Sequence, residues 1–210
     1  AFMDNWLKTH STVLFDERYF PRIEEVGAVN AQMFKSSPSE GSESARLLYL
    51  LTMASAERSI RIGNPYFVPD ELALETLIAA AKRGVKVEIV TVGPVTDAAV
   101  TRRASRAFWG RLLEAGIELY EFQPTLYHNK MMIVDDCMVS VGSTNFDNRS
   151  FRLNDEANMN IFDTGFAEEL VKVFEKDKAH SNKTSLAQWT NRPLKEKVAE
   201  RVAGLLRSQL

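Results

Sequence analysis

Two hydrophobic periodicities alternate through the middle of this chain. Apolar residues three or four positions apart, the spacing of an amphipathic helix, recur over 45–57, 70–82 and 97–115. Short apolar runs typical of strands follow each of them, at 59–62, 85–92 and 117–122. Asp70 stands where the second helix needs an N-cap, and Gly84 stands where it needs a C-terminal glycine. This alternation predicts an α/β fold with a mainly parallel sheet.

The pattern changes after residue 122. Three further strands are predicted, at 127–134, 138–141 and 157–162, and Asp135-Asp136 forms a turn between the first two. They follow one another closely, so we expect adjacent antiparallel strands that extend the sheet. A helix over 166–179 and an amphipathic helix from Leu194 onward end the chain. The expected architecture is a mixed sheet flanked by helices.

The first 44 residues differ from the rest. Residues 35–44 read KSSPSEGSES, with five serines in ten residues, which is typical of a linker. We interpret 1–44 as a connecting arm with its linker, and 45–210 as one α/β domain with a C-terminal amphipathic helix. The chain starts without Met and has three large apolar residues among its first six, so we expect it to be cut from a longer protein.

Composition and charge narrow the function classes. The 26 Lys and Arg against 28 Asp and Glu give a net charge of −2, which disfavours an extended nucleic-acid binder. The single cysteine, Cys137, excludes an internal disulfide and C-x-x-C motifs, and we expect it to be a buried small hydrophobe in a reducing compartment. The sequence contains no run of about 18 apolar residues and no basic-then-apolar leader.

The candidate chemistry lies between 127 and 156. His128 and Lys130 are two apart, so on a strand both side chains project from one face. An imidazole beside an ammonium suits a phosphate, because the cation stabilises oxyanion charge and favours the neutral, nucleophilic histidine. The segment from Gly142 through Ser143 to Asn145 follows the return strand and offers hydrogen-bond donors to phosphoryl oxygens, although it is also ordinary turn material.

Two carboxylates belong to the same window. A nucleophilic histidine needs an acceptor on its second ring nitrogen, and Glu156 on the next strand is our candidate. The alternative is that Glu156 is an ordinary exposed carboxylate. Asp135 lies at the turn, on the opposite face from His128, so we assign it a structural role, bonding turn amides.

The spacing His128-x-Lys130-x4-Asp135-x6-Gly142-Ser143-x-Asn145 resembles the H-x-K-x4-D-x6-G-S-x-N motif of the phospholipase D superfamily at all six fixed positions. Chance alone gives such a match at roughly 20⁻⁶ per starting position. Four further stretches are similar to the C-terminal half of bacterial cardiolipin synthases: 65–70, 80–87, 147–156 and 189–210. FMDNW at 2–6 is similar to the segment that closes the first half of such enzymes.

The resemblance implies one half of a pseudo-twofold, two-motif enzyme. Such enzymes need no metal or cofactor: one motif histidine attacks the phosphodiester, forming a phosphohistidine, and the other protonates the leaving alcohol. The implied function is a phosphatidyltransferase that moves a phosphatidyl group from phosphatidylglycerol to a lipid alcohol, peripherally at the bacterial cytoplasmic membrane. His10 and His180 both lack the H-x-K pattern, so the second motif must come from an N-terminal half or a second copy. His128 can fill either role, and we favour general acid.

Alternatives stay open at this point. One alternative to the phosphatidyltransferase is a homodimeric phosphodiesterase that acts on lipid or nucleic acid. Another is a catalytically silent half-domain that only docks its partner half. Arg149 fits a lipid phosphate or a structural salt bridge. Tyr66 and Phe67 line an acyl or glycerol pocket or belong to the core. The last helix mixes cations with Glu196 and Glu200 on its polar side, so we expect it to pack on its own domain rather than on a membrane.

Overall fold

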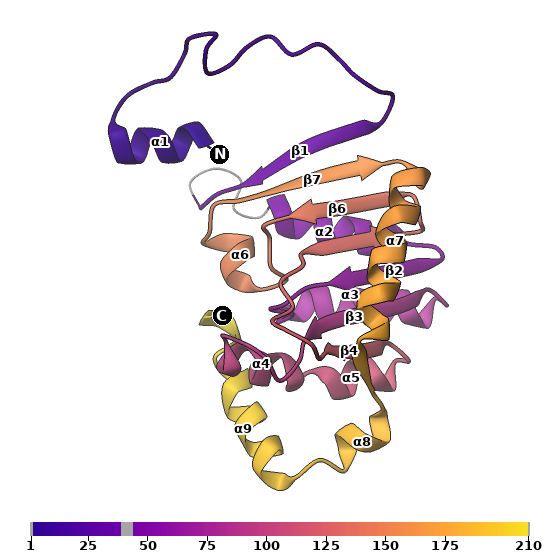
Figure 1. Cartoon of the computed structure of the whole chain (residues 1–210). Coiled ribbons are helices and arrows are strands. Elements are labelled where there is room, and N and C mark those ends of the chain that lie inside the picture. The colour runs from indigo at the N-terminus through magenta and orange to yellow at the C-terminus, as the bar shows by residue number, and fades with distance from the viewer. Residues whose placement is uncertain (1, 39–43, 210) are drawn as a thin grey trace.

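A single mixed sheet organises the part of the chain that the computed structural model describes, residues 2–38 and 44–209. Its strand order is β1-β7-β6-β5-β2-β3-β4-β8 (Figure 1). The strands are β1 (Asn30–Ser36), β2 (Ser59–Gly63), β3 (Lys86–Val92), β4 (Glu118–Phe122), β5 (Met131–Val134), β6 (Met138–Gly142), β7 (Glu156–Phe162) and β8 (Ser181–Thr184). The neighbours β2, β3 and β4 run parallel, and every other pairing is antiparallel. The mixed sheet predicted from the sequence is confirmed.

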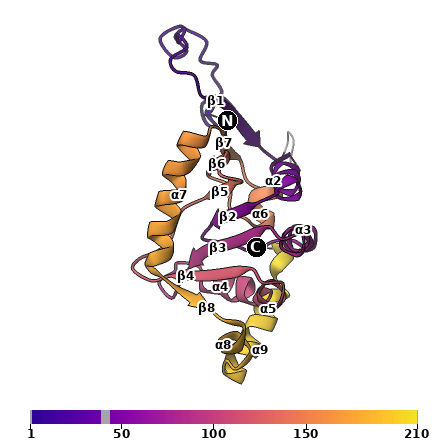
Figure 2. The same ribbon diagram turned by 90° about the vertical axis from the view of Figure 1, so that its right-hand side faces the viewer.

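Helices cover both faces of this sheet. One face carries α2 (Ser44–Ser55), α3 (Glu71–Lys82) and α5 (Trp109–Glu114), and the other carries α7 (Thr164–Ala179), as Figure 2 shows edge-on. The larger core cluster lies under α2, α3 and α5, and includes Trp109 and Leu74. A smaller cluster lies under α7 around Phe174 and Val139. The buried strands carry apolar side chains on both faces because both faces are covered.

Short-range features of the sequence explain where α3 begins and ends. The Asp70 side chain caps α3 by accepting the amide hydrogen of Ala73, and Gly84 follows the helix with a φ of +95°. The single helix expected over 97–115 is in fact two, α4 (Ala99–Arg106) and α5. The break has a packing reason, because Ala104 on α4 packs with Val68 and Ala203 while Trp109 on α5 reaches the main core.

The N-terminal arm contributes more than a connection. Residues 2–10 form α1 (Phe2–His10), and β1 pairs along its whole length with β7, from Asn30 opposite Phe162 to Ser36 opposite Glu156. This strand was not predicted, because an edge strand that is mostly exposed needs no alternating apolar pattern. The predicted linker therefore begins after Ser36 rather than at residue 35. Its positions 39–43 lie outside the described residues.

The C-terminal elements are α8 (Leu186–Thr190), α9 (Leu194–Gly204) and the short turn η1 (Arg207–Gln209). As expected, α9 packs on its own domain, with Ala203 buried against α4. The face that it buries is not the expected one, because Val198, Val202 and Leu205 point outward. Cys137 is likewise exposed rather than buried, since it lies at the turn between β5 and β6. Among the described residues, no helix combines the length and apolarity needed to cross a bilayer.

Candidate active site

Four strand ends bring the motif residues to one edge of the sheet. β5 runs antiparallel to β2, and β6 returns beside it, so the start of β5, the end of β6 and the start of β7 share the edge at which β2 ends. His128 and Lys130 precede β5, Ser143 and Asn145 follow β6, and Glu156 opens β7. The β5–β6 hairpin thus explains why His128 and Lys130 gather in space with Ser143 and Asn145, 13 to 17 positions further along the sequence.

The pair His128 and Lys130 stands just outside the sheet rather than on a strand. Residues 126–130 have no regular secondary structure, and β5 begins at Met131, which shortens the strand predicted over 127–134. The Lys130 ammonium still lies 3.2 Å from Nδ1 and 3.1 Å from Nε2 of the exposed His128 ring, and it donates to the His128 carbonyl at 3.2 Å. An imidazole and a cation therefore face solvent together.

Burial and nearby carboxylates act in opposite directions on Lys130. Partial burial lowers the pKa of Lys130, and the negative charges of Glu156, Asp147 and Asp97 oppose that shift without cancelling it. All three carboxylates are thus close enough for their charge to be felt at the Lys130 ammonium. None of these carboxylates forms an ion pair with Lys130 among the described residues, so the ammonium stays available to an incoming phosphate.

Tyr66 forms a wall beside the histidine. Its ring meets the His128 ring edge-on, with centroids 6.4 Å apart, and its hydroxyl donates to Asp97 at 2.7 Å. Burial, followed by the Asp97 carboxylate, raises the pKa of Tyr66 to about 12, so the hydroxyl stays protonated. Phe67 lies elsewhere: it is fully buried and packs on Phe146, with ring centroids 5.2 Å apart. Phe67 therefore belongs to the core, as the alternative interpretation expected.

Gly142 and Ser143 hold β7 against β6. A Cβ on Gly142 would lie 2.2 Å from the Asn158 side chain and 2.3 Å from the Ala157 carbonyl, so only glycine fits. The Ser143 hydroxyl donates to Glu156 and accepts the Ala157 amide hydrogen at 3.0 Å. We expected both residues to contact substrate, whereas their described contacts are with β7 and Glu156.

Glu156 does not reach the histidine in this structure. It is buried, and its two oxygens accept from the Ser143 hydroxyl and, at 3.3 Å, from the Asn154 amide. Within the described residues there is no hydrogen bond between Glu156 and His128, where we expected one. The carboxylate is instead directed at Ser143 and Asn154, while the Lys130 ammonium contacts both imidazole nitrogens.

A cavity of about 260 Å³ adjoins this cluster, lined by Tyr66, Ala98, Thr101, Asn145, Asp147, Arg149 and Asn154. The Asn145 side-chain oxygen is buried and has no hydrogen-bond partner among the described residues. A buried acceptor left unpaired is costly, so this oxygen is ready for a donor from a bound molecule. Arg149 is exposed, which leaves its guanidinium accessible to an anion.

Two neighbouring polar residues were missed or left without a role by the sequence reasoning. Asn64, directly after β2, accepts the amide hydrogens of Tyr66 at 3.3 Å and Phe146 at 3.1 Å, and so fixes the two loops relative to each other. Asp97 binds Tyr66, as described above. The signal for Asn64 was its place before Pro65, since a buried Asn between a strand and a proline commonly bonds loop amides. No feature of the neighbouring sequence singles out Asp97 as part of the site.

Asp135 lies at the other end of β5 from the histidine. It accepts the amide hydrogens of Glu57 at 2.9 Å, Arg58 at 2.7 Å and Ser59 at 2.8 Å. Burial opposes ionisation, yet these three hydrogen bonds outweigh it and lower the pKa of Asp135. The residue therefore binds amides, as expected, but those at the entry to β2 rather than those of its own turn, and it takes no part in the cluster.

The other two histidines are engaged elsewhere. The His10 ring stacks on Trp6 with centroids 3.9 Å apart, and His180 Nδ1 lies 2.7 Å from the Lys176 carbonyl oxygen. Within residues 2–38 and 44–209, no group of three or more His, Cys, Asp or Glu side chains is arranged to hold a metal ion. The cluster therefore offers one imidazole for chemistry.

Comparisons with known sequences agree with this geometry. A family described as "Cardiolipin synthase, PLD-like domain" matches residues 49–178. Cardiolipin synthase 2 of Staphylococcus epidermidis is 36% identical over 202 residues, which are 96% of this chain and 41% of that protein. The cardiolipin synthase of Geobacillus kaustophilus is 34% identical over 207 residues, 98% of this chain and 41% of that protein. The chain thus spans about two fifths of the length of these relatives.

Solved structures place the fold. A phospholipase D family member, Nuc from Salmonella typhimurium, superposes with a TM-score of 0.65 at 28% identity, covering 75% of this chain and 99% of that one. The phosphatidylserine synthase of Haemophilus influenzae Rd KW20 gives a TM-score of 0.69 at 15% identity, covering 98% of this chain and 53% of that one. The second likeness shows a shared fold alone.

Proposed function

The chain belongs to the family of cardiolipin synthase, PLD-like domains, and from that premise we propose that it supplies one of the two histidine motifs of a phosphatidyltransferase. The donor is phosphatidylglycerol and the acceptor is a lipid alcohol. The observation that carries the proposal is the juxtaposition of His128, Lys130 and the unpaired Asn145 oxygen at one edge of the sheet. The relatives named cardiolipin synthase support the choice of substrate class.

The proposed reaction has two displacements at phosphorus. In the first, one histidine nitrogen bonds to the phosphorus, the phosphorus–oxygen bond to glycerol breaks, and the second histidine gives its proton to the leaving oxygen. In the second, the acceptor oxygen bonds to the phosphorus, the nitrogen–phosphorus bond breaks, and the second histidine recovers a proton from the acceptor. His128 performs one of these tasks, and the other falls to a histidine outside this chain or in a second copy of it.

The neighbouring groups have distinct tasks in this scheme. The Lys130 ammonium faces the phosphoryl oxygens and offsets the charge that develops on them. The Asn145 oxygen accepts a hydrogen bond from a hydroxyl of the glycerol headgroup, which would satisfy its buried lone pair. Arg149 lines the same cavity and fits the phosphate of the lipid. Glu156 accepts hydrogen bonds from Ser143 and Asn154, and its negative charge favours the charged form of Lys130.

The direct test is product analysis on phosphatidylglycerol vesicles with the complete gene product that contains this chain. Cardiolipin and free glycerol are the expected products, whereas phosphatidic acid without cardiolipin would refute the transferase. His128→Ala should lower turnover by about three orders of magnitude or more with the fold intact. The matched control is His180→Ala on the exposed end of α7, which should leave turnover unchanged. Mass spectrometry of peptides from enzyme quenched at neutral to alkaline pH, which preserves the acid-labile nitrogen–phosphorus bond, then shows whether His128 itself carries the phosphatidyl group.

A second candidate is a homodimeric phosphodiesterase. The likeness to Nuc favours it, since that chain is covered over 99% of its length by this fold. Mixing wild-type chain with the His128→Ala variant separates the two candidates. If two copies of His128 make one site and the mixed dimer is inactive, activity falls as the square of the wild-type fraction. If another segment supplies the second histidine, activity falls in proportion to that fraction.

A further inference from the structure

Ion pairs reinforce the apolar contact that Ala203 makes between α9 and the rest of the domain. Glu200 is 2% exposed and accepts from Arg106 Nε and Arg192 Nε, each at 2.6 Å. Glu196 turns toward the same side, with its carboxylate 3.6 Å from the Arg106 guanidinium. The two acidic residues of the helix are therefore used in holding it to α4.

The apolar residues of α9 lie on the other side. Leu194, Val198, Val202 and Leu205 are between 54% and 82% exposed. At roughly 100° of rotation per residue, these four positions share an arc of about 80° on the helix surface. Their spacing matches an amphipathic helix, yet nothing in the described part of the chain covers them. We name these four residues the α9 stripe.

Cations flank the α9 stripe on both sides. On the same helical projection, Lys195 lies just beyond one border, and Arg201 and Lys197 lie beyond the other. None of these three has an ion-pair partner within residues 2–38 and 44–209. The sequence alone suggested a polar side of mixed sign. In the fold, Glu200 is buried and Glu196 lies half-exposed beside Arg106, whereas Lys195 and Arg201 are exposed and Lys197 is partly exposed. An apolar stripe bordered by cations is the pattern of a helix that lies in a membrane interface.

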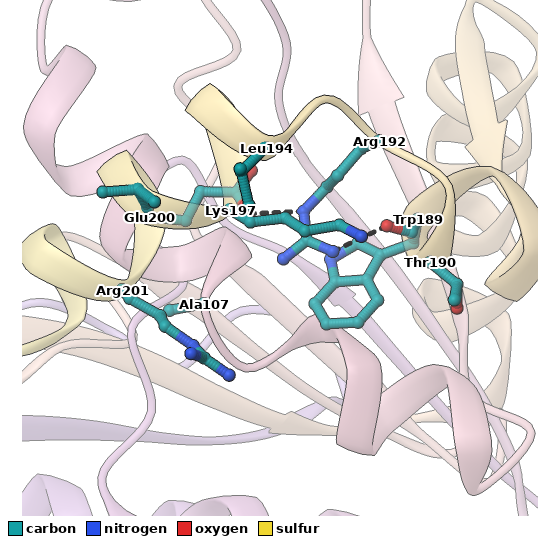
Figure 3. A pocket seen from close by; sticks show the side chains of 9 residues that line it. Ala107, Trp189, Thr190, Arg192, Leu194, Lys197, Glu200 and Arg201 are labelled. Atoms are coloured by element: carbon teal, nitrogen blue, oxygen red, sulfur yellow. Dashed lines mark hydrogen bonds and ion pairs between the residues drawn. The ribbon is translucent and has the colours of Figure 1, made fainter.

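A hollow of about 350 Å³ opens beside the α9 stripe. Figure 3 shows Trp189 at its base, with Arg192, Lys197 and Arg201 around it and Leu194 above. The Arg192 guanidinium lies 3.6 Å from the centroid of the Trp189 ring, and the indole N–H donates to the Arg106 carbonyl at 3.3 Å. Trp189 is partly buried against the main core, and its ring, covered on one face by Arg192, forms an apolar floor to this hollow with Lys197 and Arg201 at its rim.

We propose that α9 lies in the surface of an anionic bilayer, with the α9 stripe among the lipid chains and Lys195, Lys197 and Arg201 among the headgroups. Charge complementarity selects this occupant, because a second protein surface over the stripe would have to pair or desolvate three unpartnered cations at once. The inference concerns binding to lipid and does not need the proposed reaction. The proposed function is needed only for the further step, in which membrane binding by α9 brings lipid substrate to the active site.

The test is co-sedimentation of the 210-residue chain with vesicles of phosphatidylcholine, alone or mixed with phosphatidylglycerol. We expect binding that rises with the phosphatidylglycerol content and falls with salt. The double variant Lys197→Glu/Arg201→Glu should weaken partitioning by at least about tenfold, since each basic residue near an anionic surface is worth a factor of roughly five. Val198→Ser/Leu205→Ser should weaken it by about tenfold through lost apolar burial.

Matched controls come from α7, where Val173 and Lys176 are also exposed. Val173→Ser/Lys176→Glu should bind vesicles as wild type does, and circular dichroism with thermal melts should show that all variants stay folded. His128→Ala should also bind normally. Because micellar substrate needs no docking to a bilayer, the α9 variants in the complete gene product should keep their activity in detergent micelles and lose it on vesicles. A failed proposed function would instead remove activity in both.

Three outcomes would overturn the proposal. The first is equal vesicle binding by the α9 variants and wild type. The second is binding that ignores phosphatidylglycerol. The third is a stable dimer of the wild type in light scattering, with the Val198→Ser/Leu205→Ser variant monomeric, which would show that the α9 stripe contacts a second copy of this chain.

Discussion

Asp135 offers a sharp test, because its place in the motif and its place in the structure point to different roles. A motif position suggests chemistry, whereas the structure puts this carboxylate at the far end of β5, on three amides of the segment entering β2. Asp135→Asn is the informative change. The residue has a φ of +53°, a backbone conformation that Asn tolerates better than most side chains, so the variant alters the charge and leaves the turn in place.

The expected loss follows from which oxygen holds which amide. Oδ1 accepts from Arg58 and Ser59, and these two hydrogen bonds survive in Asn as neutral ones. Oδ2 accepts from Glu57, and in Asn an NH₂ group would meet that N–H donor. One lost and two weakened charge-assisted hydrogen bonds, discounted for partial solvent exposure, amount to about 2 kcal/mol. For a chain of this size, that is a fall in melting temperature of roughly 4–8 °C.

Thermal melts of wild type and Asp135→Asn across pH provide the assay. The pKa of Asp135 is lowered on folding, so its stabilising contribution is complete above the unfolded pKa, about 3.9, and is lost as pH falls through the lower folded value. The gap between the two proteins should therefore be full at pH 7 and close in acid. Turnover of the folded variant should stay within about tenfold of wild type.

The matched control is Asp136→Asn, at the next residue. Asp136 has a φ of +54° and forms an ion pair with Arg61 while its side chain is 42% exposed. Such a pair contributes at most about 1 kcal/mol, so this variant should melt within about 4 °C of wild type. An Asp135→Asn protein that melts as wild type does but loses turnover by orders of magnitude would refute the structural assignment and put Asp135 in the chemistry.

Three further predictions concern the site itself. Glu156→Gln removes a negative charge that supports Lys130, so the pKa of Lys130 should fall further in a titration followed by NMR, and turnover should fall about tenfold or more. Tyr66→Phe breaks the hydrogen bond to Asp97 and should raise KM several-fold at an unchanged melting temperature, because the pair is solvent-accessible. Gly142→Ala places a methyl group within 2.6 Å of the β7 backbone and should lower the melting temperature by at least about 5 °C.

The elements with a buried face were predictable from the sequence, because burial leaves a periodic apolar pattern. This holds for β2, β3 and α3. The N-cap at Asp70 was also predictable, because it depends only on residues next to it in the sequence. Fixed spacing within one hairpin also made the proximity of His128 and Asn145 predictable. The hairpin between β5 and β6 needs no long-range information to bring those positions to one edge.

The features that were missed depend on partners distant in the sequence. The edge strands β1 and β8 are largely exposed and are defined by backbone pairing, which leaves no mark on side-chain pattern. The contact between Tyr66 and Asp97 arises from the way α4 docks. The orientation of α9 is the clearest case: which of its charges faces inward was settled by Arg106 and Arg192, two cations that its own sequence does not contain.

The proposed membrane face and the proposed reaction meet through one short segment. Asp147, two residues after Asn145, caps α6 (Asn148–Arg152) by accepting the Ser150 amide hydrogen at 2.8 Å, and Asn148 donates to the Arg207 carbonyl just beyond α9 at 3.1 Å. Figure 1 places α6 and the C-terminal end of the chain together. If α9 lies on a bilayer, the cavity at Asn145 is therefore held near the headgroups. A net charge of −2 is then no obstacle, because Lys195, Lys197 and Arg201 stand on the face that an anionic lipid approaches.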